Sequence, residues 1–358
     1  MFERVLFAGG GTGGHIFMAV ALAQALKRRD PKVEILFVGT RKGLENNILP
    51  TLGFSFKTID IGGLKGVGLL QAMHTLSQLP GSLRTSRTIV QDFLPSIVVG
   101  LGGYSSGPVM MAGKWLGLPL VLIEPNVYPG FTNRTLRHWV DGVAVAFEET
   151  SRWFGEKAHL TGVPVRQGFL EVDSDVLVSG RIRLLVFGGS QGSRHINQMV
   201  CSALPFLPRD KFSIVHQTGS ADCLTVKDKY AEEGMESEIL DFIQDMPSYM
   251  ARSDLVISRA GASTVAEIAA TGRPAIFVPL PQATDDHQRR NAAVFVKKRA
   301  AVVLEQEETS GRELARVLVK LAGERDRLHQ MARASRDLAQ RDSKEKIIRL
   351  MEELSKAR

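Results

Sequence analysis

The chain has 358 residues, of which 44% are hydrophobic and 23% charged, a composition that is ordinary for a soluble globular α/β protein and argues against disorder. Its 45 basic and 38 acidic residues give a net charge of +7, too small an excess to indicate a nucleic-acid-binding protein. Of these, 16 basic and 11 acidic residues lie in 1–165, which favours an anionic surface or substrate there. The two cysteines match neither a disulfide framework nor a zinc spacing, which indicates a reducing cytoplasm.

Short apolar segments alternate with helical stretches along the whole chain. They are residues 5–8, 33–38, 97–100, 120–123 and 143–146, then 184–187, 212–216, 239–242, 255–258, 275–278 and 301–303. This alternation is typical of doubly wound parallel sheets, so we predict an α/β protein with two Rossmann-like lobes. The length also predicts two domains. We place their boundary near 161–168, which gives an N-terminal lobe of 1–164 and a C-terminal lobe of 165–339.

A glycine-rich turn, Gly9 to His15, follows the first strand. Glycines there let backbone N–H groups approach an anion, and the helix that follows adds its positive dipole end. The turn contains G-x-G-x-x-G, but the second strand ends in Val38-Gly39-Thr40-Arg41 without the acid that a NAD site needs. Glu3 and the turn itself also interrupt the apolar core of a secretory signal, so none is expected.

His15 lies where this turn becomes a helix, and two interpretations are open. It is either a structural histidine bonded to backbone at a helix start, or a general base for a sugar hydroxyl beside a phosphate site.

A leucine-rich segment, residues 62–91, contains basic side chains and no acid. Its apolar residues are Leu69, Leu70, Met73, Leu76, Leu79 and Leu83, and its bases include Lys65, Arg84 and Arg87. Such residues either face the core or form a patch for an anionic membrane surface, and both interpretations stay open.

Residues 93–113 carry no charged side chain and are long enough to raise the question of a membrane span. Prolines and glycines within them instead predict a strand, a loop and a helix. The loop, Gly102 to Pro108, is either a structural turn or another anion site. Glu124-Pro125-Asn126 follows the next strand, where open α/β sheets carry functional side chains.

A second glycine-rich turn, Gly188 to Ser193, follows the strand at 184–187. One chain therefore holds two phosphate-binding βα units, and with the loop at 102–108 they suggest two phosphorylated ligands.

Small residues join the strand at 255–258 to a helix, in the order Arg259-Ala260-Gly261-Ala262-Ser263-Thr264-Val265-Ala266-Glu267. One interpretation is that Ser263 or Thr264 caps this helix, with Glu267 completing a capping box. The other is that Glu267 accepts hydrogen bonds from two ribose hydroxyls.

Residues 283–291 form a dense polar cluster, Ala-Thr-Asp-Asp-His-Gln-Arg-Arg-Asn, which is either a solvated helix start or part of a site. Asp285, Asp286 and His287 would point in different directions on a helix, so we predict no metal site and no cofactor. From Gly311 onward the chain reads as helix with core-facing leucines, and we expect a last helix at about 340–358 to pack back on the first lobe.

The motifs at 9–15, 102–108, 161–166, 188–193, 259–267 and 285–291 occur in an order that resembles the MurG-type transferases. The resemblance covers nearly the whole chain. It implies the GT-B fold with an interdomain cleft, and transfer of N-acetylglucosamine from UDP-N-acetylglucosamine to undecaprenyl-pyrophosphoryl-N-acetylmuramoyl-pentapeptide. It further implies a role in peptidoglycan synthesis at the cytoplasmic face of the bacterial inner membrane.

The resemblance also implies roles for single residues. His15 would be the catalytic base. The backbone of Ile243 would contact uracil, and Glu267 would contact the ribose. Ser190 and Arg166 would contact the diphosphate. The segment from Ala262 to Ala266 belongs to the same donor site, and Gln288 would hold sugar hydroxyls. Thr12, Gly13, Gly14 and Asn126 would complete the site from the first lobe.

Four positions depart from the family pattern, namely Ile123, Pro125, Val163 and Arg289. The predicted reaction is an inverting, metal-independent glycosyl transfer without cofactor. Other GT-B enzymes on UDP-sugars, such as a lipid glycosyltransferase or a UDP-N-acetylglucosamine 2-epimerase, and a non-catalytic UDP-sugar-binding subunit are the alternatives.

Overall fold

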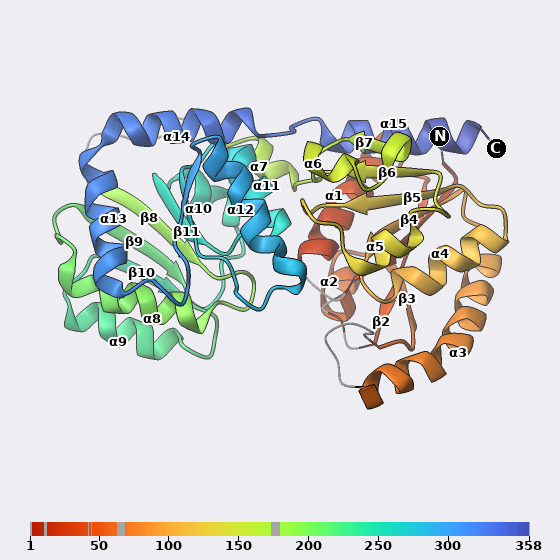
Figure 1. Ribbon diagram of the computed structural model, residues 1–358, viewed down its shortest axis with the longest axis horizontal. Helices are drawn as coiled ribbons and strands as arrows, with labels where there is room; N and C mark the ends of the chain where they lie inside the picture. The colour runs from red at the N-terminus through yellow and green to blue at the C-terminus, as the bar shows by residue number, and fades with distance from the viewer. Residues whose placement is uncertain are drawn as a thin grey trace. The chain divides into compact units, whose positions relative to one another are not determined.

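The computed structural model describes residues 2–10, 13–41, 43, 45–62, 69–172 and 180–357. The chain divides into two compact units (Figure 1). Unit 1 comprises Met1–Arg166 and Gln340–Arg358, and unit 2 comprises Gln167–Ala339. The division falls two residues after the boundary placed from the sequence.

Unit 1 contains a seven-stranded parallel sheet with the order β3-β2-β1-β4-β5-β6-β7. Its strands are β1 (Arg4–Gly9), β2 (Glu34–Thr40), β3 (Ser55–Ile59), β4 (Ile97–Gly102), β5 (Leu120–Glu124), β6 (Gly142–Val145) and β7 (Ala158–Leu160). The strand order reverses between β1 and β4. In open α/β sheets ligands bind beyond the carboxyl ends of the strands at such a switch point.

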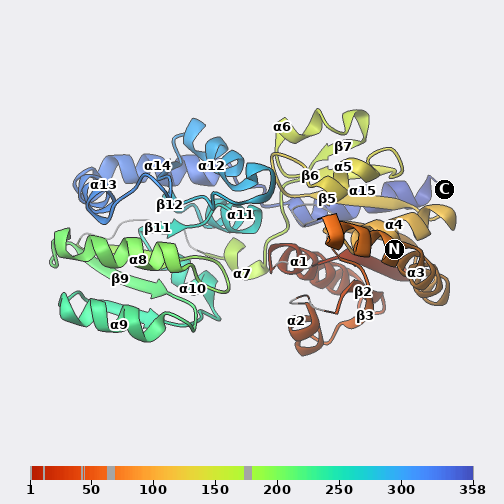
Figure 2. The ribbon, with the colours of Figure 1, turned by 60° about the horizontal axis from the view of Figure 1, so that its bottom comes forward.

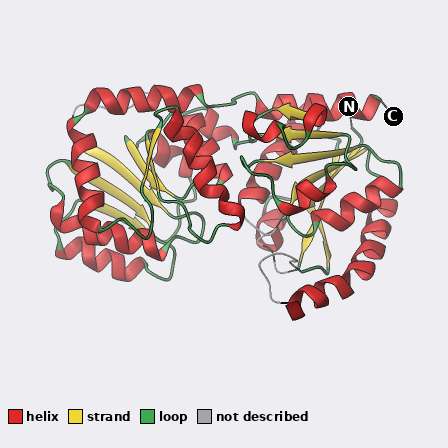
Figure 3. Ribbon diagram, in the orientation of Figure 1, coloured by secondary structure: helices red, strands yellow, loops and turns green. Residues whose placement is uncertain are grey.

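Helices lie on both faces of this sheet (Figure 3). They are α1 (Gly13–Arg29), α2 (Glu45–Thr51), α3 (Leu69–Phe93), α4 (Ser106–Trp115), α5 (Phe131–Leu136), α6 (Glu148–Ser151) and the short η1 (Gly155–Lys157). The last helix of the chain, α15 (Ser343–Lys356), packs on α1 and β6 and buries Ile347, Ile348 and Met351. The two chain ends therefore lie near each other in unit 1 (Figure 2).

Unit 2 repeats the arrangement with six parallel strands in the order β10-β9-β8-β11-β12-β13. The strands are β8 (Ile182–Phe187), β9 (Phe212–Gln217), β10 (Ser237–Leu240), β11 (Leu255–Ser258), β12 (Ala275–Phe277) and β13 (Ala301–Val303). The order reverses between β8 and β11, which places the switch point of this unit there. The predicted α/β fold class, with two parallel-sheet lobes, is confirmed.

The helices of unit 2 are α7 (Gln167–Leu170), α8 (Arg194–Ala203), η2 (Leu204–Phe206), α9 (Cys223–Glu232), α10 (Met246–Ala251), α11 (Ala262–Thr271), η3 (Thr284–Asp286), α12 (His287–Lys297), α13 (Gly311–Gly323) and α14 (Arg325–Asp337). Three of them, α8, α9 and α13, cover one face of the sheet with apolar side chains.

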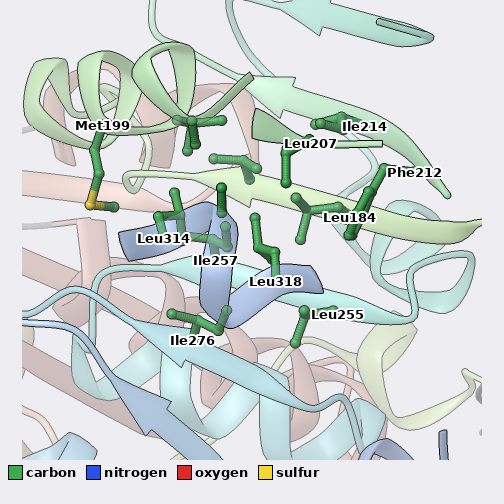
Figure 4. Packing of buried hydrophobic residues seen from close by; sticks show 14 of the residues in the cluster. Leu184, Met199, Leu207, Phe212, Ile214, Leu255, Ile257, Ile276, Leu314 and Leu318 are labelled. Atoms are coloured by element: carbon green, nitrogen blue, oxygen red, sulfur yellow. The ribbon is translucent and has the colours of Figure 1, made fainter. Parts of the chain in front are cut away.

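Alternate residues of the strands point into this core, because side chains alternate between the two faces of a sheet. Figure 4 shows Leu184, Phe212, Ile214 and Leu255 packed with Leu314 and Leu318 of α13. Each such leucine or isoleucine contributes about 1.5–3 kcal/mol by leaving water. The leucines and methionine predicted to face the core from 311 onward, Leu314, Leu318, Leu321, Leu328 and Met331, are all buried here.

Two edge strands, β3 and β7, were not predicted from the sequence. β3 buries mainly Ile59, and β7 leaves two of its three residues exposed, so neither shows the apolar run of a central strand. Residues 93–113 form strand β4, a loop and most of α4, as predicted. Among the described residues, no helix combines the length and hydropathy needed to cross a bilayer.

Candidate functional site

In unit 1 the glycine-rich turn after β1 and the loop after β4 meet at the switch point. Gly9 ends β1 opposite Gly102 of β4, and a Cβ added at Gly9 would overlap the Gly102 carbonyl oxygen. A Cβ added at Gly103 would lie 3.0 Å from the Gly10 carbonyl oxygen. Gly9, Gly102 and Gly103 also have φ values of 130°, 87° and 77°, which favour glycine. Backbone therefore packs directly against backbone at these strand ends.

Helix α1 begins at Gly13 immediately after the first loop and contains Gly14 and His15 in its first turn. His15 is half-buried, and the first turn carries no acidic side chain that would compete for an anion. Thr12, also predicted for this site, lies outside the described residues.

Arg166 belongs to unit 1 and approaches the same helix. Its guanidinium lies over the ring of Phe17, 5.2 Å from the centroid, and Phe17 is two residues beyond His15. The structure thus brings Arg166 to the first turns of α1.

Asn126 is held by Glu124, a buried carboxylate at the end of β5. One Glu124 oxygen accepts from the Asn126 backbone N–H at 3.0 Å and from its Nδ2 at 3.3 Å. The other accepts from the Gly130 N–H and from Asn133 Nδ2, both at 2.9 Å. Burial raises the pKa of Glu124, and these hydrogen bonds oppose the shift. Glu124 therefore positions Asn126, a role that its place at a strand end alone did not indicate.

In unit 2 the second glycine loop runs from the end of β8 to α8. Gly189 and Gly192 have φ values of 103° and 75°, and the Gly192 N–H donates to the Gly189 carbonyl oxygen at 3.0 Å. The same carbonyl accepts from Gln217 Nε2 at 2.8 Å. Ser190, predicted to contact diphosphate, is exposed at the tip of this loop.

Arg259, at the end of β11, is a positive charge beside this loop that the sequence interpretation did not assign. Its Nη2 donates to Ser193 Oγ at 2.9 Å and to Gln306 Oε1 at 2.8 Å, while Nη1 donates to the carbonyl oxygens of Val278 and Pro279. Burial lowers the pKa of Arg259 to about 10, so it stays charged at neutral pH. Burial and this charge together lower the pKa of His195 in the first turn of α8.

Helix α11 starts just beyond Arg259 and contains every predicted donor-site residue from Ala262 to Glu267. Its N-cap is Gly261, which makes no side-chain capping hydrogen bond. The capping interpretation of Ser263 or Thr264 with Glu267 is therefore wrong, because the N-cap lies two or three residues earlier than that motif requires. The first-turn N–H groups of α11 consequently receive no bond from an N-cap side chain.

The remaining predicted residues follow neighbouring strand ends. Ile243 is buried three residues beyond β10, and Phe242 beside it is 47% exposed. Gln288, in the first turn of α12, accepts from the Leu280 backbone N–H at 3.0 Å. Arg289 instead forms an ion pair with Glu305 at 2.8 Å, so this departure from the family pattern has its own partner.

Both halves of the chain match family models. Residues 5–145 match the glycosyltransferase family 28 N-terminal domain, and residues 183–350 match the C-terminal domain of that family. A protein of Syntrophus aciditrophicus named "UDP-N-acetylglucosamine--N-acetylmuramyl-(pentapeptide) pyrophosphoryl-undecaprenol N-acetylglucosamine transferase" is 44% identical over 319 residues, covering 88% of each chain. A Myxococcus xanthus protein of the same name is 42% identical over 92% of this chain and 87% of its own. The crystal structure of Acinetobacter baumannii MurG superposes with a TM-score of 0.82 at 28% identity, covering 98% and 99%.

This chain belongs to the MurG family of glycosyltransferases. Its two parallel-sheet units are the domains of the GT-B fold. The MurG family identity agrees with the geometry of each unit, in which glycine loops, helix N-termini and one buried arginine gather at the switch points.

Proposed function

We propose that this protein transfers N-acetylglucosamine from UDP-N-acetylglucosamine to the 4-hydroxyl of lipid-linked N-acetylmuramoyl-pentapeptide, which converts lipid I to lipid II in peptidoglycan synthesis. The observation that carries the proposal is identity of 42–44% to transferases of that name over most of the chain. The switch-point loops of both units support it, because a nucleotide-sugar substrate requires diphosphate binding.

We assign the UDP-sugar to unit 2. The buried Arg259 charge, the loop that presents Ser190 and the start of α11 all favour a diphosphate there. Glu267 would accept from the ribose hydroxyls, the Ile243 backbone would meet uracil, and Gln288 would contact the sugar. The family resemblance also assigns Arg166, a residue of unit 1, to the diphosphate.

The proposed chemistry is a single inverting displacement. The acceptor 4-hydroxyl oxygen attacks the anomeric carbon and forms the new glycosidic bond while the bond to the UDP β-phosphate breaks. His15 takes the hydroxyl proton, and UDP leaves with the bonding electron pair. Loop N–H groups, helix N-termini and arginine stabilise the charge that develops on the diphosphate, so the proposed reaction needs no metal.

Unit 1 would take the acceptor and rest on the anionic inner-membrane surface. On α3, Ile89 and Val90 are buried, Leu79 and Leu83 are half-buried, and Arg84 and Arg87 are exposed. The side chains of Leu69, Leu70, Met73 and Leu76 lie outside the described ones, and so does Lys65.

The membrane assignment can be tested by sedimentation with anionic vesicles. Each base near the surface contributes about 1 kcal/mol, so the double variant Arg84→Glu with Arg87→Glu should bind at least tenfold more weakly. The control is Lys211→Glu, an exposed base of unit 2. Equal binding of both variants would contradict the assignment.

Release of UDP from UDP-N-acetylglucosamine, with and without lipid-linked muramoyl-pentapeptide, tests the reaction itself. We expect release only with the acceptor, unchanged by EDTA. Donor turnover without acceptor would point to an epimerase, and binding without turnover to a non-catalytic subunit. Preference for a diacylglycerol acceptor would point to a different lipid glycosyltransferase.

A further inference from the structure

A chain of polar side chains lies inside the apolar core of unit 2. His216 occupies the last core-facing position of β9, after Phe212 and Ile214, and is fully buried. Its Nδ1 lies 3.1 Å from Tyr230 Oη of α9, and its Nε2 lies 3.1 Å from Asn197 Oδ1 of α8. A buried polar group is retained at such a position only when its hydrogen bonds are satisfied.

The direction of each hydrogen bond in this chain follows from the outermost contacts. Asn197 Nδ2 donates to the Thr218 carbonyl oxygen and to Asp222 Oδ2, both at 2.9 Å. The other carboxamide atom is therefore the oxygen, which must accept from His216 Nε2–H. Nδ1 of the neutral ring then accepts from the Tyr230 hydroxyl. One tautomer of His216 satisfies all of these contacts.

The charge states of the two ring groups agree with this arrangement. Burial lowers the pKa of His216 to about 3 and raises that of Tyr230 well above its usual value. The imidazole is neutral and the phenol protonated at every physiological pH, so the order of donors and acceptors is fixed.

The series of hydrogen bonds from Tyr230 through His216 to Asn197 ends at the backbone beside the second glycine loop. Thr218, whose carbonyl oxygen accepts from Asn197, follows β9, and a Cβ added at Gly192 would overlap that same oxygen. A Cβ added at Gly219 would overlap the Gln191 carbonyl oxygen. The loop that presents Ser190 thus lies against the backbone that Asn197 holds.

We propose that His216 is a positioning residue for the donor diphosphate, acting through Asn197 and Thr218 on the loop from Gly188 to Ser193. The proposal rests on the proposed function in one respect, that this loop binds the UDP diphosphate. His216 touches no substrate. Its Nε2–H fixes the Asn197 carboxamide, and Asn197 fixes the backbone against which Gly192 packs.

The test compares variants of the full chain by UDP affinity and by steady-state kinetics. His216→Leu removes the Nε2–H donor and leaves the buried Asn197 Oδ1 without its partner, so we expect the UDP dissociation constant and the donor KM to rise about tenfold. The KM for the lipid acceptor should not change. His216→Gln, whose amide can donate to Asn197, should restore most of the donor affinity.

Tyr230→Phe is the matched control, because it removes a buried hydroxyl from the same chain but leaves the bond from His216 to Asn197. It should lower the unfolding temperature while the donor KM stays within about twofold of wild type. A donor KM that follows unfolding temperature across these three variants would overturn the positioning role. So would a ¹⁵N spectrum showing the His216 proton on Nδ1, a measurement that needs no variant.

Ser190→Ala separates this inference from the proposed function. Unchanged UDP affinity in Ser190→Ala would place the diphosphate elsewhere and reject the assigned loop. Weaker UDP binding in Ser190→Ala, with wild-type binding in His216→Leu, would reject the role of His216 alone.

Discussion

Alanine substitutions at two glycines of the second loop should separate backbone conformation from close packing. Gly192 has φ +75° and a Cβ there would overlap the Thr218 carbonyl oxygen, whereas Gly189 has φ +103° and open space around its Cβ position. Gly53, in the turn before β3, has nearly the φ of Gly192, +74°, and also open space. The three positions form a matched set within one chain.

The expected magnitudes follow from these geometries. A positive φ costs a non-glycine residue about 1–3 kcal/mol, and this cost applies to all three variants. Overlap with a fixed carbonyl oxygen adds about 1–3 kcal/mol, and this second cost applies to Gly192→Ala alone. Gly192→Ala should therefore destabilise unit 2 by about 2–6 kcal/mol, against about 1–3 kcal/mol for Gly189→Ala.

Urea unfolding measures these differences, with each variant compared on the transition of its own unit because the chain has two. Isothermal calorimetry with UDP gives the functional consequence. In Gly192→Ala the loop must move to relieve the overlap, so the affinity of this variant for UDP should fall at least about tenfold. The affinity of Gly189→Ala should fall less. Gly53→Ala should bind UDP as wild type does. Equal stability and equal UDP affinity of the two loop variants would refute the close-approach argument.

Three further predictions concern single side chains. His15→Ala should lower kcat about 10²- to 10⁴-fold with unchanged UDP affinity, whereas wild-type turnover would remove the base assignment. In Glu124→Gln, two of the four donors that bond the Glu124 carboxylate would face an NH₂ group, so unit 1 should lose about 2–4 kcal/mol of stability. The control, Glu149→Gln at an exposed position, should change stability by under about 0.5 kcal/mol. Equal effects would count against the network. His216, with a pKa of about 3 folded and 6.5 unfolded, contributes stability above pH 6.5 that is lost as pH falls toward 3. Relative to His216→Gln, wild type should lose about 3 kcal/mol between pH 6.5 and 4, and parallel pH profiles would reject the low pKa.

The central strands could be predicted because their signal is local. β1, β4, β5, β8 and β11 each contain a buried apolar run, and such runs, here residues 5–8, 97–100, 120–123, 184–187 and 255–257, stand out in the sequence. β10 was predicted at 239–242 but occupies Ser237–Leu240, because its pairing with β9 ends at Leu240 opposite Gln217. That register leaves Phe242 in an exposed loop. Pairing of this kind depends on a partner strand and not on the apolar residues themselves.

The side chains that organise the site were less predictable for the same reason. Arg259 acquires its role from Ser193 and Gln306, which lie 66 and 47 residues away along the chain. His216 likewise depends on Asn197 and Tyr230 from two different helices. The loops themselves were found because glycines at a strand end are a local signal. The capping prediction at α11 failed for the opposite reason. A local capping motif was present in the sequence, but the helix starts before it, with Gly261 as its N-cap.

The two switch points differ in a way that decides where negative charge should be bound. In unit 1 the strand ends meet backbone to backbone at Gly9 and Gly102, and the buried side chain of Glu45, a carboxylate, lies beside the adjoining Gly10. In unit 2 the Arg259 guanidinium lies beside the loop and keeps its charge despite burial. Net charge predicts the reverse, because the basic excess lies in residues 1–165. A buried charge acts through a lower dielectric than an exposed one and is screened less by salt. We therefore expect the diphosphate to bind beside Arg259 in unit 2. The exposed bases of unit 1 suit an extended anionic surface.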